Sequence, residues 1–172
     1  MRSEERRAAI LRRLKGADAP LSASALAAEY GVSRQIVVGD IALLRAAGED
    51  IAATPRGYVV QTAPAGLIRQ IACRHEDAEM KAELNAIVDQ GCTVLDVIVE
   101  HPVYGQLTGA LQLRSRYDVG EFLRRCEDSD ARPLSELTDG LHLHTLSCPD
   151  EAAYARVRDS LRTLGFLLED GD

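Results

Sequence analysis

The sequence lacks the features that mark membrane-inserted and secreted proteins. Its longest strongly apolar run, residues 93–99, contains an aspartate and is far shorter than the roughly 20 residues that a membrane-spanning helix needs. The first ten residues carry charges of both signs and contain no apolar segment of the kind found in signal peptides. We therefore expect a cytoplasmic protein. Its widely spaced cysteines form no CxxC pair and are expected to be reduced packing residues: Cys73, Cys92, Cys126 and Cys148.

A large excess of basic residues is also missing, because the 172 residues carry a net charge of −7. The charge is unevenly distributed, however. Residues 1–62 contain 9 Lys and Arg against 7 Asp and Glu, a net charge of +2, whereas the remainder contains 11 basic and 20 acidic residues. The acidic second part cannot attract a polyanion, so any contact with nucleic acid is expected from the first part.

Three segments of the first part show the apolar spacing and the end signals of short helices. Residues 4–16 and 22–31 each end at a glycine, and residues 33–48 begin at Ser33, an N-cap residue, and also end at a glycine. Two helices joined by a short turn that contains glycine are typical of a helix-turn-helix. Residues 51–61 follow as two short β-prone runs around Pro-Arg-Gly, which predicts a hairpin with a basic tip, the wing of a winged helix-turn-helix.

The segment 33–48 is the one that would enter the major groove of DNA. Three of its apolar residues recur at helical spacing and are expected in the core: Val37, Ile41 and Leu44. The residues left toward the outside, with the arginine of the wing tip, are the expected DNA contacts: Ser33, Arg34, Gln35, Val38, Gly39 and Arg56. Arg34 can pair with guanine and Gln35 with adenine, while Gly39 allows the duplex backbone to approach closely.

The alternative interpretation of this first part is a small helical scaffold used for protein contacts. The apolar spacing, the helix caps and the basic tip together favour binding of double-stranded DNA. A net charge of +2 implies moderate affinity for a single module. Recognition of a specific operator therefore predicts two modules, and hence a homodimer on a palindromic site.

The second part shows alternating strand and helix signals after a linker. Residues 61–66 are small and include a proline, which places the predicted domain boundary between residues 62 and 63. We expect an α+β protein, a winged helix-turn-helix over residues 1–62 followed over residues 63–172 by an α/β sandwich with helices on one face of a sheet. The predicted strands are residues 67–73, 93–105, 106–113 and 140–148, and the predicted helices are residues 76–91, 115–128 and 150–165.

All four histidines lie in this second part. In the stretch LHLHTL, residues 141–146, a strand points His142 and His144 to the same face. A lone histidine is usually an ordinary surface or core residue, but two imidazoles that share one strand face indicate a common partner. Two nitrogens do not complete a metal site, because transition-metal ions normally take three or four protein ligands.

The remaining ligands are expected where a predicted strand ends and a helix begins. His75 lies at that junction, and Glu83, eight residues on and a little over two helical turns away, returns to the azimuth of the helix start. Both can then meet His142 and His144 over the sheet. Three imidazoles and a carboxylate favour zinc, nickel, iron or manganese over calcium. The rival carboxylates lie at the start of the helix and more simply stabilise its N-terminus: Glu76, Asp77 and Glu79.

The remaining histidine, His101, precedes a proline at the end of a predicted strand. This position is suited to the edge of a loop that faces a ligand. Three roles stay open for His101: completing the metal shell, donating a hydrogen bond to a bound anion, or capping the local backbone.

With both parts in view, the chain resembles the niacin-responsive transcriptional repressors (the NiaR family), which join an N-terminal winged helix-turn-helix to a C-terminal three-histidine (3H) domain. The resemblance covers essentially the whole chain and is carried by VSRQIVVGDIALLRAAG and ATPRGY in the first part and by RHEDAEMKAEL, VEHPVYG, SRYDV and LHLHTL in the second. It implies a repressor of niacin salvage, transport or NAD synthesis genes, with nicotinic acid as co-repressor. It also implies a divalent transition metal in the 3H domain, held by the four positions proposed above: His75, Glu83, His142 and His144.

A pyridine carboxylate such as nicotinic acid needs a flat apolar slot and donors for its carboxylate. The expected effector-binding residues are His101, Tyr104 and Arg116. Without an effector, Tyr104 is a core-edge aromatic and Arg116 a surface partner of Asp118. Regulation is expected as a population shift, in which metal and effector favour the relative pose of two DNA-binding modules that fits the half-site spacing.

Two other functions compete with this one. Three histidines and a carboxylate with an open coordination position can activate water for hydrolysis. The sequence offers no clear general base to serve such a metal and places a DNA-binding domain in front, so we expect no enzyme. The alternative regulator is one in which the metal is itself the signal and no organic effector binds.

Overall fold

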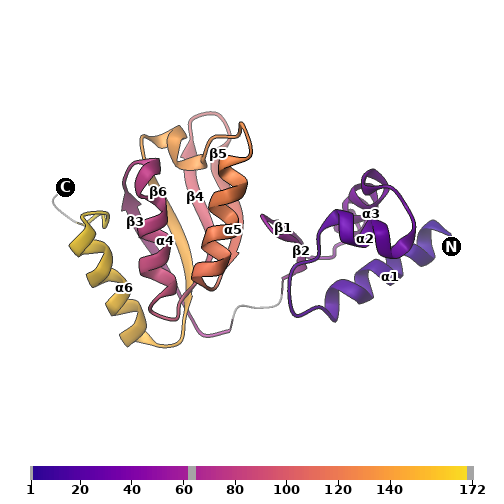
Figure 1. Ribbon diagram of the computed structural model, residues 1–172, viewed down its shortest axis with the longest axis horizontal. Helices are drawn as coiled ribbons and strands as arrows, with labels where there is room; N and C mark the ends of the chain where they lie inside the picture. The colour runs from indigo at the N-terminus through magenta and orange to yellow at the C-terminus, as the bar shows by residue number, and fades with distance from the viewer. Residues whose placement is uncertain (1, 62–64, 170–172) are drawn as a thin grey trace. The chain divides into compact units, whose positions relative to one another are not determined.

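The structure is a computed structural model that describes residues 2–61 and 65–169. The chain divides into two compact units, residues 1–63 and residues 64–172, which are described separately below (Figure 1). The predicted domain boundary between residues 62 and 63 lies outside the described residues. No helix in the described part of the chain combines the length and apolar character needed to cross a membrane.

Three helices and a hairpin form the first unit, which confirms the predicted winged helix-turn-helix. The helices are α1 (Ser3–Lys15), α2 (Ala23–Tyr30) and α3 (Arg34–Ala46). The turn between α2 and α3 has the predicted chemistry, because Gly31 ends α2 in the left-handed conformation and the Ser33 hydroxyl accepts a hydrogen bond from the amide of Ile36. The buried core shared by these elements is Ile10, Leu14, Ala23, Leu26, Ala27, Val37, Ile41, Leu44 and Ile51.

A buried carboxylate fixes α3 against α1. Asp40 lies on the inner side of α3 and is buried, and its two carboxylate oxygens accept hydrogen bonds of 2.6 and 3.2 Å from the guanidinium of Arg6. A paired, two-pronged contact of this kind satisfies a carboxylate that would otherwise be costly to bury. The ion pair therefore sets the orientation of the helix that is expected to read DNA.

The wing is the hairpin of β1 (Ile51–Thr54) and β2 (Gly57–Val60), joined by the two residues Pro55 and Arg56. The amide and carbonyl groups of Tyr58 hydrogen-bond to those of Leu21, ahead of α2, so the wing is attached to the helical core through its backbone. Gly57 makes this close approach possible. Its φ is +134°, and a Cβ atom there would lie 2.4 Å from the backbone of Leu21.

An antiparallel four-stranded sheet in the order β3-β6-β4-β5 forms the centre of the second unit. The strands are β3 (Leu67–Arg74), β4 (Thr93–His101), β5 (Gly105–Leu113) and β6 (Leu141–Cys148). Because β3 and β4 are both antiparallel to β6, the end of β3, the end of β4 and the start of β6 lie at the same end of the sheet. Three segments that are far apart in the sequence therefore meet there.

Helices α4 (Met80–Val88), α5 (Arg116–Glu127) and α6 (Glu151–Leu164) lie on one side of this sheet (Figure 1). This arrangement confirms the predicted α/β sandwich. Two short 3-10 helices were not predicted, η1 (Asp77–Glu79) directly ahead of α4 and η2 (Leu134–Thr138) ahead of β6. The predicted start of the first helix at residue 76 is thus a 3-10 turn, with α-helix from residue 80. The core between helices and sheet is contributed by Ile71, Leu84, Ile87, Val94, Leu113, Val119, Leu146, Val157, Leu161 and other apolar residues.

Replacement of Gly57 by alanine is expected to destabilise the first unit by about 1–3 kcal/mol, because the new Cβ would collide with the backbone of Leu21 and φ would stay in a region unfavourable for alanine. Gly39→Ala is the matched control. Gly39 is an exposed residue inside α3 with open space around its Cα, so alanine should raise the free energy of unfolding by about 0.5–1 kcal/mol. Urea titrations followed by far-ultraviolet circular dichroism measure both changes; a Gly57 variant as stable as the parent would contradict the proposed attachment of the wing.

Candidate metal centre

The four side chains predicted to bind a metal lie together on the helix side of the second unit. Strand β6 alternates between buried and half-buried residues, and its buried series includes His142 and His144. Glu83 projects from the first turn of α4 and is only 1% exposed, a rare environment for a carboxylate. His75 follows the last residue of β3 and is also buried.

All three imidazoles face the carboxylate of Glu83 through the same ring atom, Nε2. The Nε2 of His75 lies 2.6 Å from one carboxylate oxygen of Glu83. The Nε2 atoms of His142 and His144 lie 2.9 and 3.3 Å from the other oxygen. The rings of His75 and His144 each meet the ring of His142 edge to face, with centroids 4.9 and 4.8 Å apart. Imidazoles from two segments, the end of β3 and strand β6, therefore converge on a buried carboxylate of a third, α4.

The opposite ring atom, Nδ1, is engaged by a backbone carbonyl in each histidine. Nδ1 of His75 lies 2.7 Å from the carbonyl oxygen of Glu76, that of His142 lies 2.8 Å from Gly140, and that of His144 lies 2.7 Å from Asp96. A carbonyl oxygen only accepts hydrogen bonds, so each Nδ1 carries the proton. In the neutral form each Nε2 then directs a lone pair at Glu83, which is the tautomer of a histidine that binds a metal through Nε2.

This arrangement is incomplete without a cation or additional protons. Three lone pairs that face a carboxylate repel one another unless a positive charge lies between them. The Nε2 of His144 illustrates the problem, because among the residues that the structure describes it is a buried nitrogen without a hydrogen-bond partner, although Glu83 lies 3.3 Å away. The 3.3 Å between the Nε2 of His144 and Glu83 is short enough for an ion pair, but the angles do not meet those of a hydrogen bond. A divalent transition metal, which these nitrogen and oxygen donors suit, fits the site.

The titration of these groups reflects the same demand for positive charge. Burial opposes the charged form of His75 and of His144, but the Glu83 carboxylate outweighs it and raises the pKa of both imidazoles above 6.5. Burial would also raise the pKa of Glu83, yet the three surrounding histidines hold that pKa well below its usual 4.5. In the absence of metal, the carboxylate is thus stabilised by protons on the neighbouring imidazoles.

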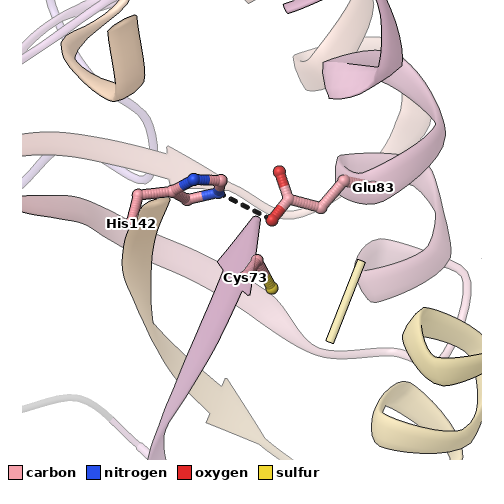
Figure 2. A group of neighbouring side chains, drawn as sticks. All are labelled: Cys73, Glu83 and His142. Atoms are coloured by element: carbon pink, nitrogen blue, oxygen red, sulfur yellow. Dashed lines mark hydrogen bonds and ion pairs between the residues drawn. The ribbon is translucent and has the colours of Figure 1, made fainter. Parts of the chain in front are cut away.

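A fifth side chain, Cys73, was not among the predicted ligands. Its sulfur, one carboxylate oxygen of Glu83 and a ring nitrogen of His142 all lie within 4.8 Å of one another (Figure 2). Burial and the nearby Glu83 carboxylate raise the pKa of the Cys73 thiol. This buried cluster of cysteine, glutamate and histidine can hold a metal ion. The sequence places Cys73 two residues before His75 on a strand, but its meeting with His142 depends on the pairing of β3 with β6.

The structure brings together only two of the three predicted effector contacts. The rings of His101 and Tyr104 are in contact, with centroids 5.0 Å apart, at the turn between β4 and β5. Arg116 begins α5, beyond the other end of β5, and is separated from that turn by the nine residues of the strand, roughly 25–30 Å. Its guanidinium donates hydrogen bonds of 2.5 and 2.7 Å to the carboxylate of Asp89. Arg116 therefore pairs with Asp89 and not with the expected Asp118.

His101 shares a face of the sheet with the metal centre. Ile98 pairs with Leu143 of β6, so His101 points to the same face of the sheet as His142. The two Cα atoms are expected roughly 8 Å apart from ideal strand spacing. The Nδ1 of His101 accepts hydrogen bonds from the amides of Val103 and Tyr104, at 3.1 and 3.2 Å. A proton on its Nε2 is therefore available to donate to a ligand.

On α3, most of the predicted DNA contacts are exposed, namely Ser33, Arg34, Gln35 and Gly39. The prediction that Val38 faces outward is corrected, because Val38 is half-buried and packs against the core of the first unit. At 100° per residue, position 38 lies on the flank of the helix, whereas Gln35, Gly39 and Ala42 form its outermost ridge. Ile36, on the opposite flank of the helix, is exposed and was not among the predicted contacts. Arg56 at the wing tip is half-buried rather than fully exposed.

The two units correspond to known domain families. A helix-turn-helix (HTH) domain family matches residues 6–59, and a 3H domain family matches residues 68–170. A helix-turn-helix joined to a 3H domain defines a class of DNA-binding transcription repressors, rather than a class of enzymes.

Two curated relatives match nearly the full length of the chain. The chain is 43% identical over 168 residues to a probable transcription repressor NiaR of Thermotoga maritima. The aligned residues span 98% of this chain and 96% of that relative. The chain is also 44% identical over 169 residues to a transcription repressor NadR of Bacillus subtilis. That alignment spans 96% of this chain and 94% of the relative. The chain belongs to the NiaR/NadR family of transcription repressors, as the sequence motifs predicted.

The electrostatics of the centre predict how stability depends on pH when a chelator removes metal. The raised pKa values of His75 and His144 contribute stability that is fully present below pH 6.5 and is lost as the pH rises through those values. The lowered pKa of Glu83 contributes stability that is present above pH 4.5 and is lost as the pH falls through its lowered value. The metal-free second unit should therefore be most stable between these limits and weaken toward alkaline pH. Urea titrations across this range measure the effect.

The isosteric variant Glu83→Gln removes the anion and should abolish most of this pH dependence. Glu121→Gln, at a half-buried position of α5 beside Arg124, is the matched control and should preserve this pH dependence. With zinc bound, the free energy of unfolding should instead rise with pH, because protons compete with the metal for the imidazoles. A metal-free parent protein whose stability is equal at pH 6 and pH 9 would contradict the assigned protonation.

Proposed function

We propose that the chain is a niacin-responsive repressor, in which residues 1–62 bind operator DNA and residues 63–172 bind a divalent transition metal and nicotinic acid. The observation that carries the proposal is the set of three Nε2 lone pairs directed at the buried Glu83 carboxylate. Such a set has no ordinary structural use, because apolar residues would fill the same space without the cost of burying charge. Its place in a chain that also carries a helix-turn-helix makes it a sensor.

The proposed metal ligands are His75, Glu83, His142 and His144. Each of these imidazoles donates its Nδ1 proton to a backbone carbonyl, which orients the ring and makes Nε2 a better ligand. The donor set suits zinc, nickel, iron or manganese. A bound ion of this kind supplies a positive charge and an open coordination position for an anionic or nitrogen ligand.

The effector site is proposed on the part of the sheet between the metal centre and the turn after β4. His101 offers an Nε2 proton that can donate to a carboxylate, and Tyr104 offers an exposed aromatic face against which a pyridine ring can stack. Arg116 is left out of this proposal, because it lies beyond the far end of β5 and is bound to Asp89.

The DNA contacts are proposed on the outer ridge of α3. Arg34 and Gln35 stand at its exposed N-terminal end, where side chains reach base edges in the major groove. Because Gly39 has no side chain, the duplex can approach the helix backbone at the middle of the ridge. Ser33 and Arg56 are proposed to contact the phosphate backbone, and the small charge of the unit supports a homodimer on two half-sites.

A metal-sensing repressor without an organic effector is the second candidate. It is favoured by the position of Arg116, since the cation expected to bind the effector carboxylate is absent from the turn that holds His101 and Tyr104. In that case the ion alone shifts the population between DNA-binding and non-binding poses.

Fluorescence anisotropy with a duplex selected by the protein from a random pool tests these functions. The metal-loaded protein should bind the duplex more tightly in the presence of nicotinic acid, by about 5–150-fold for a typical allosteric coupling. Equal affinity with and without nicotinic acid, together with a dependence on added metal, would favour the metal sensor. Affinity that depends on neither would contradict both proposals.

His144→Ala in the same assay removes a ligand and should lower metal affinity by at least roughly 100-fold, since even indirect partners of a metal contribute 10–100-fold. The response to nicotinic acid should be lost with it. Thr145→Ala is the matched control, because Thr145 follows His144 on β6 but points to the opposite face of the sheet. That variant should keep both the metal and the response.

Gly39→Ala should separate stability from function. Alanine is expected to stabilise α3 and yet weaken binding of the selected duplex by roughly tenfold, because its methyl group raises the ridge that meets DNA. Gly120→Ala, at an exposed glycine with open space inside α5, is the matched control and should leave DNA binding unchanged. Equal duplex affinity of the Gly39 variant and the parent would place the DNA on another surface.

A further inference from the structure

Cys73 occupies an unusual position for a buried cysteine. It is fully buried near the end of β3, directly opposite His142 in the pairing of β3 with β6. Its sulfur lies within 4.8 Å of a Glu83 oxygen and a His142 nitrogen, and Figure 2 shows the three side chains as neighbours on two strands and a helix. A cysteine that serves only as a small hydrophobe is normally surrounded by apolar atoms. This one borders the most polar point of the interior.

Ile71, two residues earlier on the same face of β3, and Cys73 both belong to the apolar core between sheet and helices, together with Leu84 and Leu146. Cys73 adds to this packing a thiol beside the Glu83 carboxylate. A valine or alanine at position 73 would continue that packing without placing a thiol beside a carboxylate. The sulfur therefore calls for an explanation in terms of what binds at Glu83.

We propose, on the basis of the metal centre proposed above, that the Cys73 thiolate is an additional ligand of the same ion. As the sulfur–metal bond forms, the S–H bond breaks and its proton passes to solvent. The donor set then contains nitrogen, oxygen and sulfur. A thiolate shifts the preference of the site toward zinc, cobalt and nickel and away from manganese.

The spacing is compatible with a shared ion. Zinc binds sulfur at about 2.3 Å and imidazole nitrogen at about 2.0–2.1 Å, so two such ligands at the roughly 90–120° angles of a five-coordinate ion lie about 3.1–3.8 Å apart. Donor atoms within 4.8 Å of one another need to close by about 1–2 Å. The backbone pairing of β3 with β6 already holds Cys73 and His142 side by side, so side-chain rotation alone can make this change.

Cobalt(II) titration of the metal-free full chain tests the inference. Visible d–d bands report binding by any donors, whereas a near-ultraviolet sulfur-to-cobalt charge-transfer band reports a thiolate ligand. The parent protein should show both. Cys73→Ser should keep the d–d bands and lose the charge-transfer band, and its preference for zinc over manganese should fall at least about tenfold. Cys126→Ser, the control for a partly exposed thiol, should keep both spectra.

Three outcomes would overturn the inference. Visible bands without a charge-transfer band in the parent would reject Cys73 as a ligand while leaving the histidine and glutamate site intact. A charge-transfer band that survives in Cys73→Ser and disappears in Cys126→Ser would assign it to the wrong thiol. Absence of any cobalt spectrum in the parent would reject the metal centre and this inference together.

X-ray absorption of the zinc-loaded parent protein keeps the test independent of the variant. If Cys73→Ser does not fold, a sulfur scatterer at about 2.3 Å supports the inference, because Cys126→Ser excludes the partly exposed thiol. A shell that contains only nitrogen and oxygen at about 2.0–2.2 Å overturns it.

Discussion

The burial of one carboxylate governs the second unit. Glu83 is removed from water in the first turn of α4, and an isolated carboxylate cannot be kept charged in such a place. The three imidazoles that meet it come from the end of β3 and from β6, so the electrostatic demand of a single residue ties a helix to two strands. Buried ion pairs of this type contribute little net stability, because desolvation offsets the attraction. In the proposed function, an ion that completes the group accounts for their retention.

The orientation of the three rings is as informative as their proximity. Each ring is held by a hydrogen bond from Nδ1 to a backbone carbonyl, and these carbonyls belong to Glu76, Gly140 and Asp96. The backbone around the centre thus selects the tautomer of the side chains inside it. Chance packing alone does not explain why the same nitrogen is directed at the Glu83 carboxylate in all three cases.

The DNA-binding unit is built on a separate core and a separate ion pair. Asp40 and Arg6 fix α3 against α1, and the backbone bridge between Tyr58 and Leu21 fixes the wing. The contacts that hold α3 and the wing therefore do not involve the outer ridge of α3. Gln35, Gly39 and Ala42 are exposed there, and two of the three are small residues, a composition that suits close approach of a rigid surface. In the proposed mechanism, coupling between metal and DNA acts on the placement of whole units.

Much of this organisation was determined by the sequence alone, because it depends on local rules. The caps at Ser22 and Ser33, the glycine at position 31 and the apolar spacing of α3 specify a helix-turn-helix without reference to the rest of the chain. The two-residue alternation of LHLHTL places His142 and His144 on one face, and the interval of eight residues brings Glu83 back over His75. Only the tertiary structure decided what depends on strand register and strand length. It placed Cys73 opposite His142, moved Arg116 to the far end of β5 from His101, and supplied a carbonyl for each Nδ1. The physical reason is that periodicity fixes the direction of a side chain along its own element, whereas its neighbour on another strand follows from how the strands pair.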